Sequence, residues 1–219
     1  MQTETIPINH PDTIQKALYV LNTGGVIAFP TDTIYGLAAS ASNSTAIENL
    51  FEIKGRDQTK AIAVLIGNLS QFEQVGYLSI TTSREQNNNA LNLARHFWPG
   101  ALTLVVPRHP DLPDILSPHP TIGIRMPDHP LLQTMLETTG PLATTSANLS
   151  GGPNPVSARQ VLEQLNGRIN LLLDGGQTPG PIASTVVDCT HTPPIVLRQG
   201  AVTFTSLKGI LPNLLSSPQ

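Results

Sequence analysis

Charge and cysteine are both scarce in this sequence. Asp, Glu, Lys and Arg make up 12% of its 219 residues, against about 25% in an average soluble domain. The 12 basic and 15 acidic side chains leave a formal net charge of −3. This balance excludes a strongly basic nucleic-acid binder whose affinity depends on many phosphate contacts. A single cysteine, Cys189, excludes an internal disulfide framework and a multi-cysteine metal site.

Long apolar runs and the best-marked catalytic motifs are absent as well. No stretch of about 18 apolar residues predicts a transmembrane helix. The first ten residues lack the basic start and the apolar stretch of a signal peptide. The sequence has no Walker loop, no G-x-G dinucleotide fingerprint, no H-E-x-x-H motif and no G-x-S-x-G around Ser146. We therefore expect a cytoplasmic protein without membrane contact and without a metal site built from its own side chains.

The 20 prolines and 17 glycines indicate many short elements joined by tight turns. Apolar residues at helical spacing predict helices, with Ser44 and Ser157 as N-caps, over 14–21, 47–54, 91–98, 131–136 and 158–165. Apolar runs bounded by Gly or Pro predict buried strands over 26–29, 61–66, 102–106, 122–125, 142–145, 171–173, 185–188 and 195–197. The polar stretch from Thr81, with Asn87–Asn89, is interpreted as a loop or a helix start.

These elements predict an α/β protein with a mixed sheet flanked by helices. We expect an N-terminal segment over residues 1–12, one catalytic domain over 13–205 and a short C-terminal tail over 206–219.

Polar or charged residues interrupt the apolar pattern at several strand ends. Residues 29–37, Phe-Pro-Thr-Asp-Thr-Ile-Tyr-Gly-Leu, place hydroxyls and a carboxylate after a strand, which suits either a polar ligand or an ordinary turn. Lys54, Arg56 and Lys60 form a local positive site for phosphate or carboxylate oxygens. The alternative for these cations is a helix C-terminus followed by a solvated loop.

Three further segments carry the same kind of signal. Arg125 ends an apolar strand, where a charge needs either a ligand or a buried acidic partner. Residues 142–154 combine small hydroxyl and amide side chains with Gly151 and Gly152, which suits a phosphate or nucleotide cradle or an ordinary connection. Residues 174–200 add a glycine-rich loop running to Pro181, then Ser184 and Arg198. Together these strand ends predict a pocket for an anionic ligand at the edge of the sheet.

In their order and spacing, the segments resemble the YrdC-like family of threonylcarbamoyl-AMP synthases, single-domain type. The resemblance runs from about Thr13 to Gly200 and rests on the stretches PTDTIYGL, KGR, HFWPGALTLV, IGIRMPDHP, TTSANLSG, STVVD and LRQG. It implies a twisted α/β sheet with a concave basic ligand-binding face. It also implies the synthesis of threonylcarbamoyl-AMP and pyrophosphate from L-threonine, bicarbonate or CO2, and ATP. A partner transferase machinery then carries the threonylcarbamoyl group to a tRNA adenosine.

The resemblance also assigns roles to residues of this chain. Lys54, Arg56, Ser146 and Asn148 fall on the positions that line the reaction site. The nucleotide side adds Lys60, Thr121, Asn154 and Arg198, and the threonine side takes Thr33, Arg125, Thr144 and Ser184. Leu65 departs from the pattern, because some relatives have a histidine there that contacts threonine. Mg²⁺ is expected only through the nucleotide.

The implied chemistry needs no protein nucleophile. Neutral threonine amine attacks CO2 or bicarbonate, and the resulting carboxylate attacks the α-phosphate of ATP, where nearby cations stabilise the growing charge. No general base is identified, and Asp32 is the nearest carboxylate in a matching motif. Two alternatives stay open: an RNA-binding module that uses a local basic patch for weak tRNA or double-stranded RNA binding, and a carbamoyl-adenylate-handling relative that acts on another amine.

Overall fold

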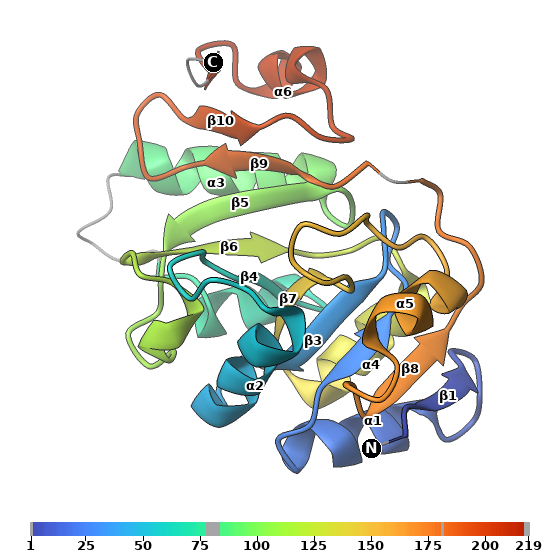
Figure 1. Ribbon diagram of the computed structural model, residues 1–219. Helices are drawn as coiled ribbons and strands as arrows, with labels where there is room; N and C mark the ends of the chain where they lie inside the picture. The colour runs from blue at the N-terminus through green and yellow to red at the C-terminus, as the bar shows by residue number, and fades with distance from the viewer. Residues whose placement is uncertain (1, 78–83, 181, 217–219) are drawn as a thin grey trace.

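The computed structural model describes residues 2–77, 84–180 and 182–216, and this part of the chain forms one 11-stranded sheet with helices on both faces (Figure 1). The strand order is β1-β8-β2-β3-β7-β4-β6-β5-β9-β10-β11. The strands are β1 (Glu4–Pro7), β2 (Ile27–Phe29), β3 (Gly36–Ser40), β4 (Ala63–Leu65), β5 (Leu102–Pro107), β6 (Thr121–Arg125), β7 (Leu142–Ser146), β8 (Leu171–Asp174), β9 (Thr185–Asp188), β10 (Ile195–Arg198) and β11 (Leu215–Ser216).

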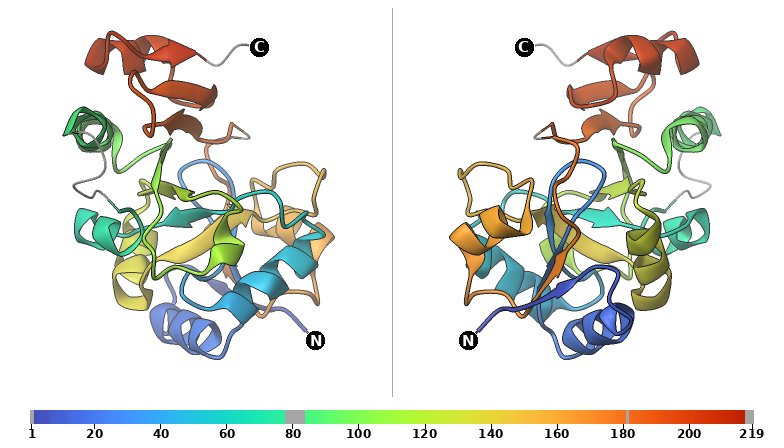
Figure 2. Two further views of the ribbon diagram at one scale, coloured as in Figure 1. Left: turned by 90° about the vertical axis from the view of Figure 1, so that its left-hand side faces the viewer. Right: turned by 90° about the vertical axis from the view of Figure 1, so that its right-hand side faces the viewer.

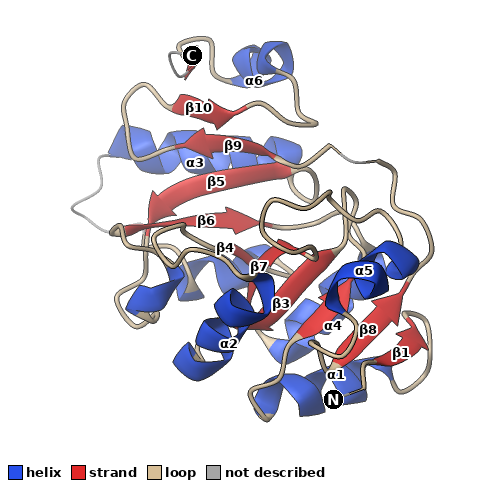
Figure 3. Ribbon diagram, in the orientation of Figure 1, coloured by secondary structure: helices blue, strands red, loops and turns tan. Residues whose placement is uncertain are grey.

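The helices connect these strands and cover the sheet (Figure 3). They are α1 (Thr13–Asn22), α2 (Ser44–Lys54), α3 (Arg84–Phe97), α4 (Pro130–Thr139), α5 (Ala158–Leu165) and α6 (Phe204–Ile210), with short 3₁₀ turns at Leu69–Gln74 and Asp114–Leu116. Parallel pairs such as β1–β8 and β4–β6 occur beside antiparallel pairs such as β2–β3 and β5–β6. The predicted α/β class with a mixed sheet is therefore confirmed.

Alternating side chains along the strands divide the core into two parts. Ile27 and Phe29 pack with α1 and α4, whereas Val26 and Ala28 belong to the larger cluster that includes residues of α2, α3 and α5. This alternation follows from the two-residue period of a strand, which directs successive side chains to opposite faces. Figure 2 shows α1 and α4 together on one side of the molecule and α2 and α5 on the other.

Several elements of the structure were not predicted from the sequence, most of them near the ends of the chain. Strand β1 lies within the expected N-terminal segment and pairs with β8, and α6 crosses the expected boundary at residue 205 with Leu207 in the core. Strands β3 and β11 were also not predicted. Asn87–Asn89 lie inside α3, whereas Thr81–Ser83 and Pro181 are outside the described residues.

One predicted cap is wrong and one is confirmed. The N-cap of α2 is Asn43, whose side chain accepts a hydrogen bond from the Ala46 N–H at 3.0 Å, and Ser44 is the first helical residue. Ser157 caps α5 as predicted. Within the described part of the chain, no helix is both long enough and apolar enough to cross a membrane.

Candidate functional site

Helices leave part of one sheet face uncovered, and this part forms a cavity. On the face that packs against α1 and α4, Ala38, Leu65 and Leu142 belong to the apolar cluster. On the same face and the same strands, two residues away from these positions, lie Gly36, Ala63 and Thr144. They line a cavity of about 370 Å³. The register joins the strands side by side, because Ala63 lies opposite Thr144 and Leu65 lies opposite Arg125.

Small and polar side chains occupy the open part of the face where a covered face would have bulky apolar ones. The cavity lining continues through Gly123 and Arg125 of β6, Thr103 and Val105 of β5, and Val186 of β9. The residues between them, such as Ile122, Ile124 and Leu104, point to the opposite face and belong to the core. The cavity therefore results from the alternation of side chains along the central strands, which directs small or polar residues to one face and apolar residues to the other.

Gly36 and Gly123 leave space in the cavity because they have no side chain. A Cβ at Gly123 would lie 3.1 Å from Thr103 Cγ2 and 3.5 Å from Ala63 Cβ, and a Cβ at Gly36 would lie 3.0 Å from Thr144 Cγ2. These positions already touch their neighbours, so a larger side chain could extend only into the cavity.

Arg125 is the buried cation of the cavity, with 7% of its surface exposed. Its Nε donates to the Gly100 carbonyl at 3.0 Å, its Nη1 to Thr33 Oγ1 at 3.0 Å and its Nη2 to Asp32 Oδ1 at 2.5 Å. Burial lowers the pKa of Arg125, and the neighbouring Asp32 carboxylate opposes this effect. Three of the five guanidinium N–H groups have these protein acceptors, so a bound carboxylate could use the two others.

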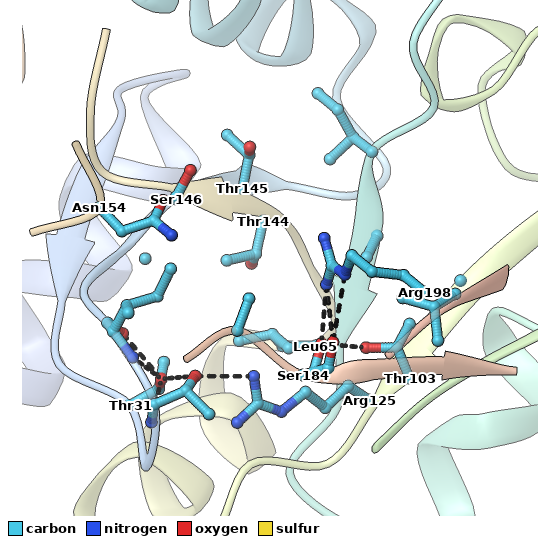
Figure 4. Close-up of a pocket in the computed structure, with 18 of the residues that line it drawn as sticks. Thr31, Leu65, Thr103, Arg125, Thr144, Thr145, Ser146, Asn154, Ser184 and Arg198 are labelled. Atoms are coloured by element: carbon cyan, nitrogen blue, oxygen red, sulfur yellow. Dashed lines mark hydrogen bonds between the residues drawn. The ribbon is translucent and has the colours of Figure 1, made fainter. Parts of the chain in front are cut away.

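Hydroxyl groups surround this guanidinium from two directions. Thr31 Oγ1 lies 2.9 Å from Thr33 Oγ1, and Thr103 Oγ1 lies 2.8 Å from Ser184 Oγ. Arg198 donates from Nη2 to the Ser184 carbonyl at 2.9 Å. Figure 4 shows Arg125 and Arg198 on one side of the open space and Ser146 and Asn154 on the other. A ligand in the cavity would meet three arginines, hydroxyls and an amide, because Arg56 also lines it.

Lys54 lies outside the cavity lining, behind the loop that follows β7. Its Nζ donates to the carbonyls of Ser146 and Asn148 at 2.7 and 2.8 Å and reaches their side-chain oxygens at 3.2 and 2.8 Å. Only 3% of its surface is exposed. Burial, and then the charge of Arg56, lower the pKa of Lys54 to about 7.

The predicted site residues thus separate into two groups. The cavity lining includes Thr33, Arg56, Arg125, Thr144, Ser146, Asn154, Ser184 and Arg198. The lining does not include Lys54, Lys60, Thr121 or Asn148. Arg56 reaches the cavity because Gly55, at φ +59°, ends α2 and turns the chain. The Nη2 of Arg56 donates to the Ala61 carbonyl at 2.9 Å.

Thr31 belongs to the hydroxyl group that the sequence indicated at 29–37, whereas Thr103, Gly36 and Gly123 were not predicted as lining residues. The available signal was the alternation in Thr-Ile-Gly-Ile-Arg at 121–125, where every second residue is small or polar. Asp32, considered as a base, pairs with Arg125. Leu65 lines the cavity beside Arg125, which lies opposite it on the neighbouring strand. Among the residues that the structure describes, no group of three or more His, Cys, Asp or Glu side chains could hold a metal ion.

The fold and this cavity define an α/β protein with a cavity lined by arginines and hydroxyls on one sheet face. Residues 19–200 match the Sua5/YciO/YrdC family, whose description reads "Telomere recombination". The chain belongs to this family.

A curated relative and two solved structures extend this similarity. The chain is 38% identical over 212 residues to the threonylcarbamoyl-AMP synthase of Bacillus subtilis (strain 168), covering 95% of this chain and 59% of the relative. The crystal structure of P. abyssi Sua5 complexed with L-threonine matches all of this chain and 63% of its own, at 32% identity and a TM-score of 0.91. The E. coli YciO crystal structure matches 94% of this chain and 98% of its own, at 26% identity and a TM-score of 0.77. The chain thus spans about three fifths of the first two proteins.

Proposed function

We propose that this protein is a threonylcarbamoyl-AMP synthase, which makes threonylcarbamoyl-AMP and pyrophosphate from L-threonine, bicarbonate or CO2, and ATP. The observation that carries the proposal is Arg125, a buried guanidinium held by three protein acceptors at one end of a cavity lined by hydroxyls. The B. subtilis relative has this activity in its name, and the P. abyssi relative has been crystallised with L-threonine.

In this proposal, threonine binds at the Arg125 end of the cavity. The two remaining N–H groups of the guanidinium bind the carboxylate. Thr33, Thr144 and Ser184 surround the amino acid from three segments of the chain. The ion pair of Asp32 with Arg125, together with the Gly100 carbonyl, fixes the orientation of the guanidinium before the substrate arrives.

ATP takes the rest of the cavity, with Ser146 and Asn154 on one side, Arg198 on the other, and Arg56 also in the lining. Two arginines suit phosphate oxygens because the planar guanidinium offers paired donors. Lys60, Thr121 and Asn148 stay in the proposal as residues near the nucleotide, outside the lining. Mg²⁺ enters with the triphosphate, since oxygen ligands and phosphates are its usual partners.

The reaction then needs two bond-forming steps. The neutral threonine amine attacks bicarbonate and releases water, or attacks CO2 and releases its proton to solvent, and either route gives the N-carboxythreonine carboxylate. The new carboxylate oxygen attacks the α-phosphorus of ATP while the bond to the β-phosphate oxygen breaks, so that pyrophosphate leaves. Arg56 and Arg198 stabilise the charge that grows on the phosphate oxygens. The proposal includes a cytoplasmic location and a transferase machinery that uses the product to modify tRNA.

Pyrophosphate release tests the proposal directly. The protein should release pyrophosphate from ATP only when both L-threonine and bicarbonate are present, and mass spectrometry should detect threonylcarbamoyl-AMP. Release that does not depend on threonine, or that follows carbamoyl phosphate instead, would reject the activity. Tight, salt-sensitive RNA binding without turnover would favour an RNA-binding module.

A further inference from the structure

Lys54 is a buried residue whose side chain contacts a loop and does not line the cavity. The loop from Ser146 to Asn154, here the serine–asparagine loop, follows β7 and contributes its two end residues to the cavity lining. We propose that Lys54 is a positioning residue, which acts on the nucleotide by holding the serine–asparagine loop in place and does not contact the nucleotide itself. The part of this inference that concerns the nucleotide rests on the proposed function.

The contacts of Lys54 support this inference first. An ammonium has three N–H groups, and four loop oxygens lie within 3.2 Å of Nζ. The Ser150 N–H also donates to the Lys54 carbonyl at 2.8 Å, so both the backbone and the side chain of this residue hold the loop. All the donors of Lys54 therefore have partners before any nucleotide binds.

Other residues also hold the serine–asparagine loop, but they contact different parts of it from Lys54. Asn148 Nδ2 donates to the Gly152 carbonyl at 2.7 Å, which closes the loop on itself. Gln164 of α5 accepts from the Leu149 N–H and donates to the Pro153 carbonyl, each at 3.2 Å. Helix α5 thus supports the far side of the loop, and Lys54 supports the side next to β7. Removing its ammonium leaves the carbonyls of Ser146 and Asn148 without this charged donor, and hydrogen bonds to charged groups are the stronger ones.

A direct contact with phosphate would require Nζ to leave these oxygens. The same four oxygens would then lose their donor at the moment when the loop has to order around the nucleotide. Arg56 and Arg198 already line the cavity and can meet the phosphates without such a change. The two roles make different predictions for the protein without nucleotide.

The experiment compares hydrogen exchange and nucleotide affinity in a set of variants. Lys54→Met and Asn148→Ala remove the two partners singly and together, Arg56→Met changes a cavity residue, and Lys16→Met, a partly exposed lysine paired with Glu4, is the matched control. Amide exchange in the serine–asparagine loop is measured without nucleotide, with the α4 amides, which contain none of the substituted residues, as an internal reference. ATP affinity is measured by calorimetry, and kcat and KM by pyrophosphate release.

Lys54→Met should accelerate exchange of the Ser150 and Gly152 amides by about 10-fold or more and weaken ATP binding by about 10- to 150-fold. The loss of ATP affinity in the double variant with Asn148→Ala should be smaller than the sum of the two single losses, because the two residues share the contact between Lys54 Nζ and Asn148 Oδ1. Arg56→Met should weaken ATP binding while loop exchange stays unchanged, and Lys16→Met should change neither. KM for ATP should rise more than kcat falls.

Unchanged loop exchange in Lys54→Met together with weaker ATP binding would overturn the inference in favour of direct contact. Faster exchange with unchanged affinity, or additive effects in the double variant, would also overturn it. If Lys54→Met does not fold, Lys54→Gln, a shorter and uncharged polar side chain, decides by the same exchange and affinity criteria. If the native protein binds no ATP, the proposed function fails, while the exchange data still test whether Lys54 holds the loop.

Discussion

A side chain added at Gly123 tests most directly whether the substrate binds over this part of the sheet face. Gly123 lies on β6 two residues before Arg125, opposite Val105 of β5 and next to Ala63 of β4. Gly123→Ala adds a Cβ that touches Thr103 Cγ2 at 3.1 Å, and Gly123→Val adds two further methyl groups that can extend only into the open space. We expect these variants to fold and to lose ligand binding in steps.

The magnitude follows from the contacts. At 3.1 Å the neighbouring methyl has to move by a few tenths of an ångström, so Gly123→Ala should change the free energy of unfolding by less than about 1 kcal/mol. In the complex, the added methyls of Gly123→Val compete with the substrate for packed space, and overpacking costs about 1–3 kcal/mol. This cost corresponds to about 5- to 150-fold weaker threonine binding.

Calorimetry with threonine, in the presence of a non-hydrolysable ATP analogue, measures the affinity, and urea unfolding measures stability. Gly209→Ala is the control, because no heavy atom lies within 4 Å of its added Cβ on α6, away from the cavity lining. If Gly123→Val folds normally and binds threonine with unchanged affinity, the uncovered part of the sheet face is not the binding surface.

Three further predictions concern charged and titrating groups. Asp32→Ala should lower the free energy of unfolding by about 3 kcal/mol, because it leaves the buried Arg125 charge unpaired; a urea-measured loss under 1 kcal/mol would contradict this. His129 caps α4 by accepting from the Leu132 N–H, and burial lowers its pKa. As the pH drops below 6.5, the ordinary pKa of histidine, the unfolded ring binds a proton that the folded ring excludes. The free energy of unfolding should therefore decrease as the pH is lowered. His129→Asn should remove this acid loss and keep the cap; an unchanged pH profile would refute the assignment. Burial raises the pKa of Cys189 to about 12, so thiol reagents at pH 8 should label it only as fast as the protein unfolds, and rapid native-state labelling would be inconsistent with this environment.

Regular elements inside the domain could be predicted because their patterns are local. The runs that form β5, β6, β7 and β8 are apolar and bounded by turn residues, and their predicted limits lie within one residue of the observed ones. Strand β3 could not be predicted in this way. Gly36–Ser40 is a run of small residues whose strand character comes from pairing with β2 and β7, a property of the fold rather than of the segment.

The site could be predicted as far as its polar residues stand out in apolar runs. Arg125 at the end of a strand allowed two interpretations, a ligand or a buried acid, and the structure provides the acid, Asp32. The cavity lining at Thr103 and Gly123 depends on which half of a sheet face the helices leave uncovered, and no local pattern contains that information. The interior position of Lys54 likewise depends on a loop 92 residues away in sequence.

The most direct test of the account is a crystal structure of the protein with L-threonine and a non-hydrolysable ATP analogue bound together. The account predicts the threonine carboxylate on Arg125 and the phosphates between Arg56, Ser146 and Arg198, in the cavity over Gly123. It also predicts that Lys54 Nζ keeps its contacts with Ser146 and Asn148. Threonine or nucleotide density outside this cavity would contradict the central claim that the uncovered sheet face is the reaction site.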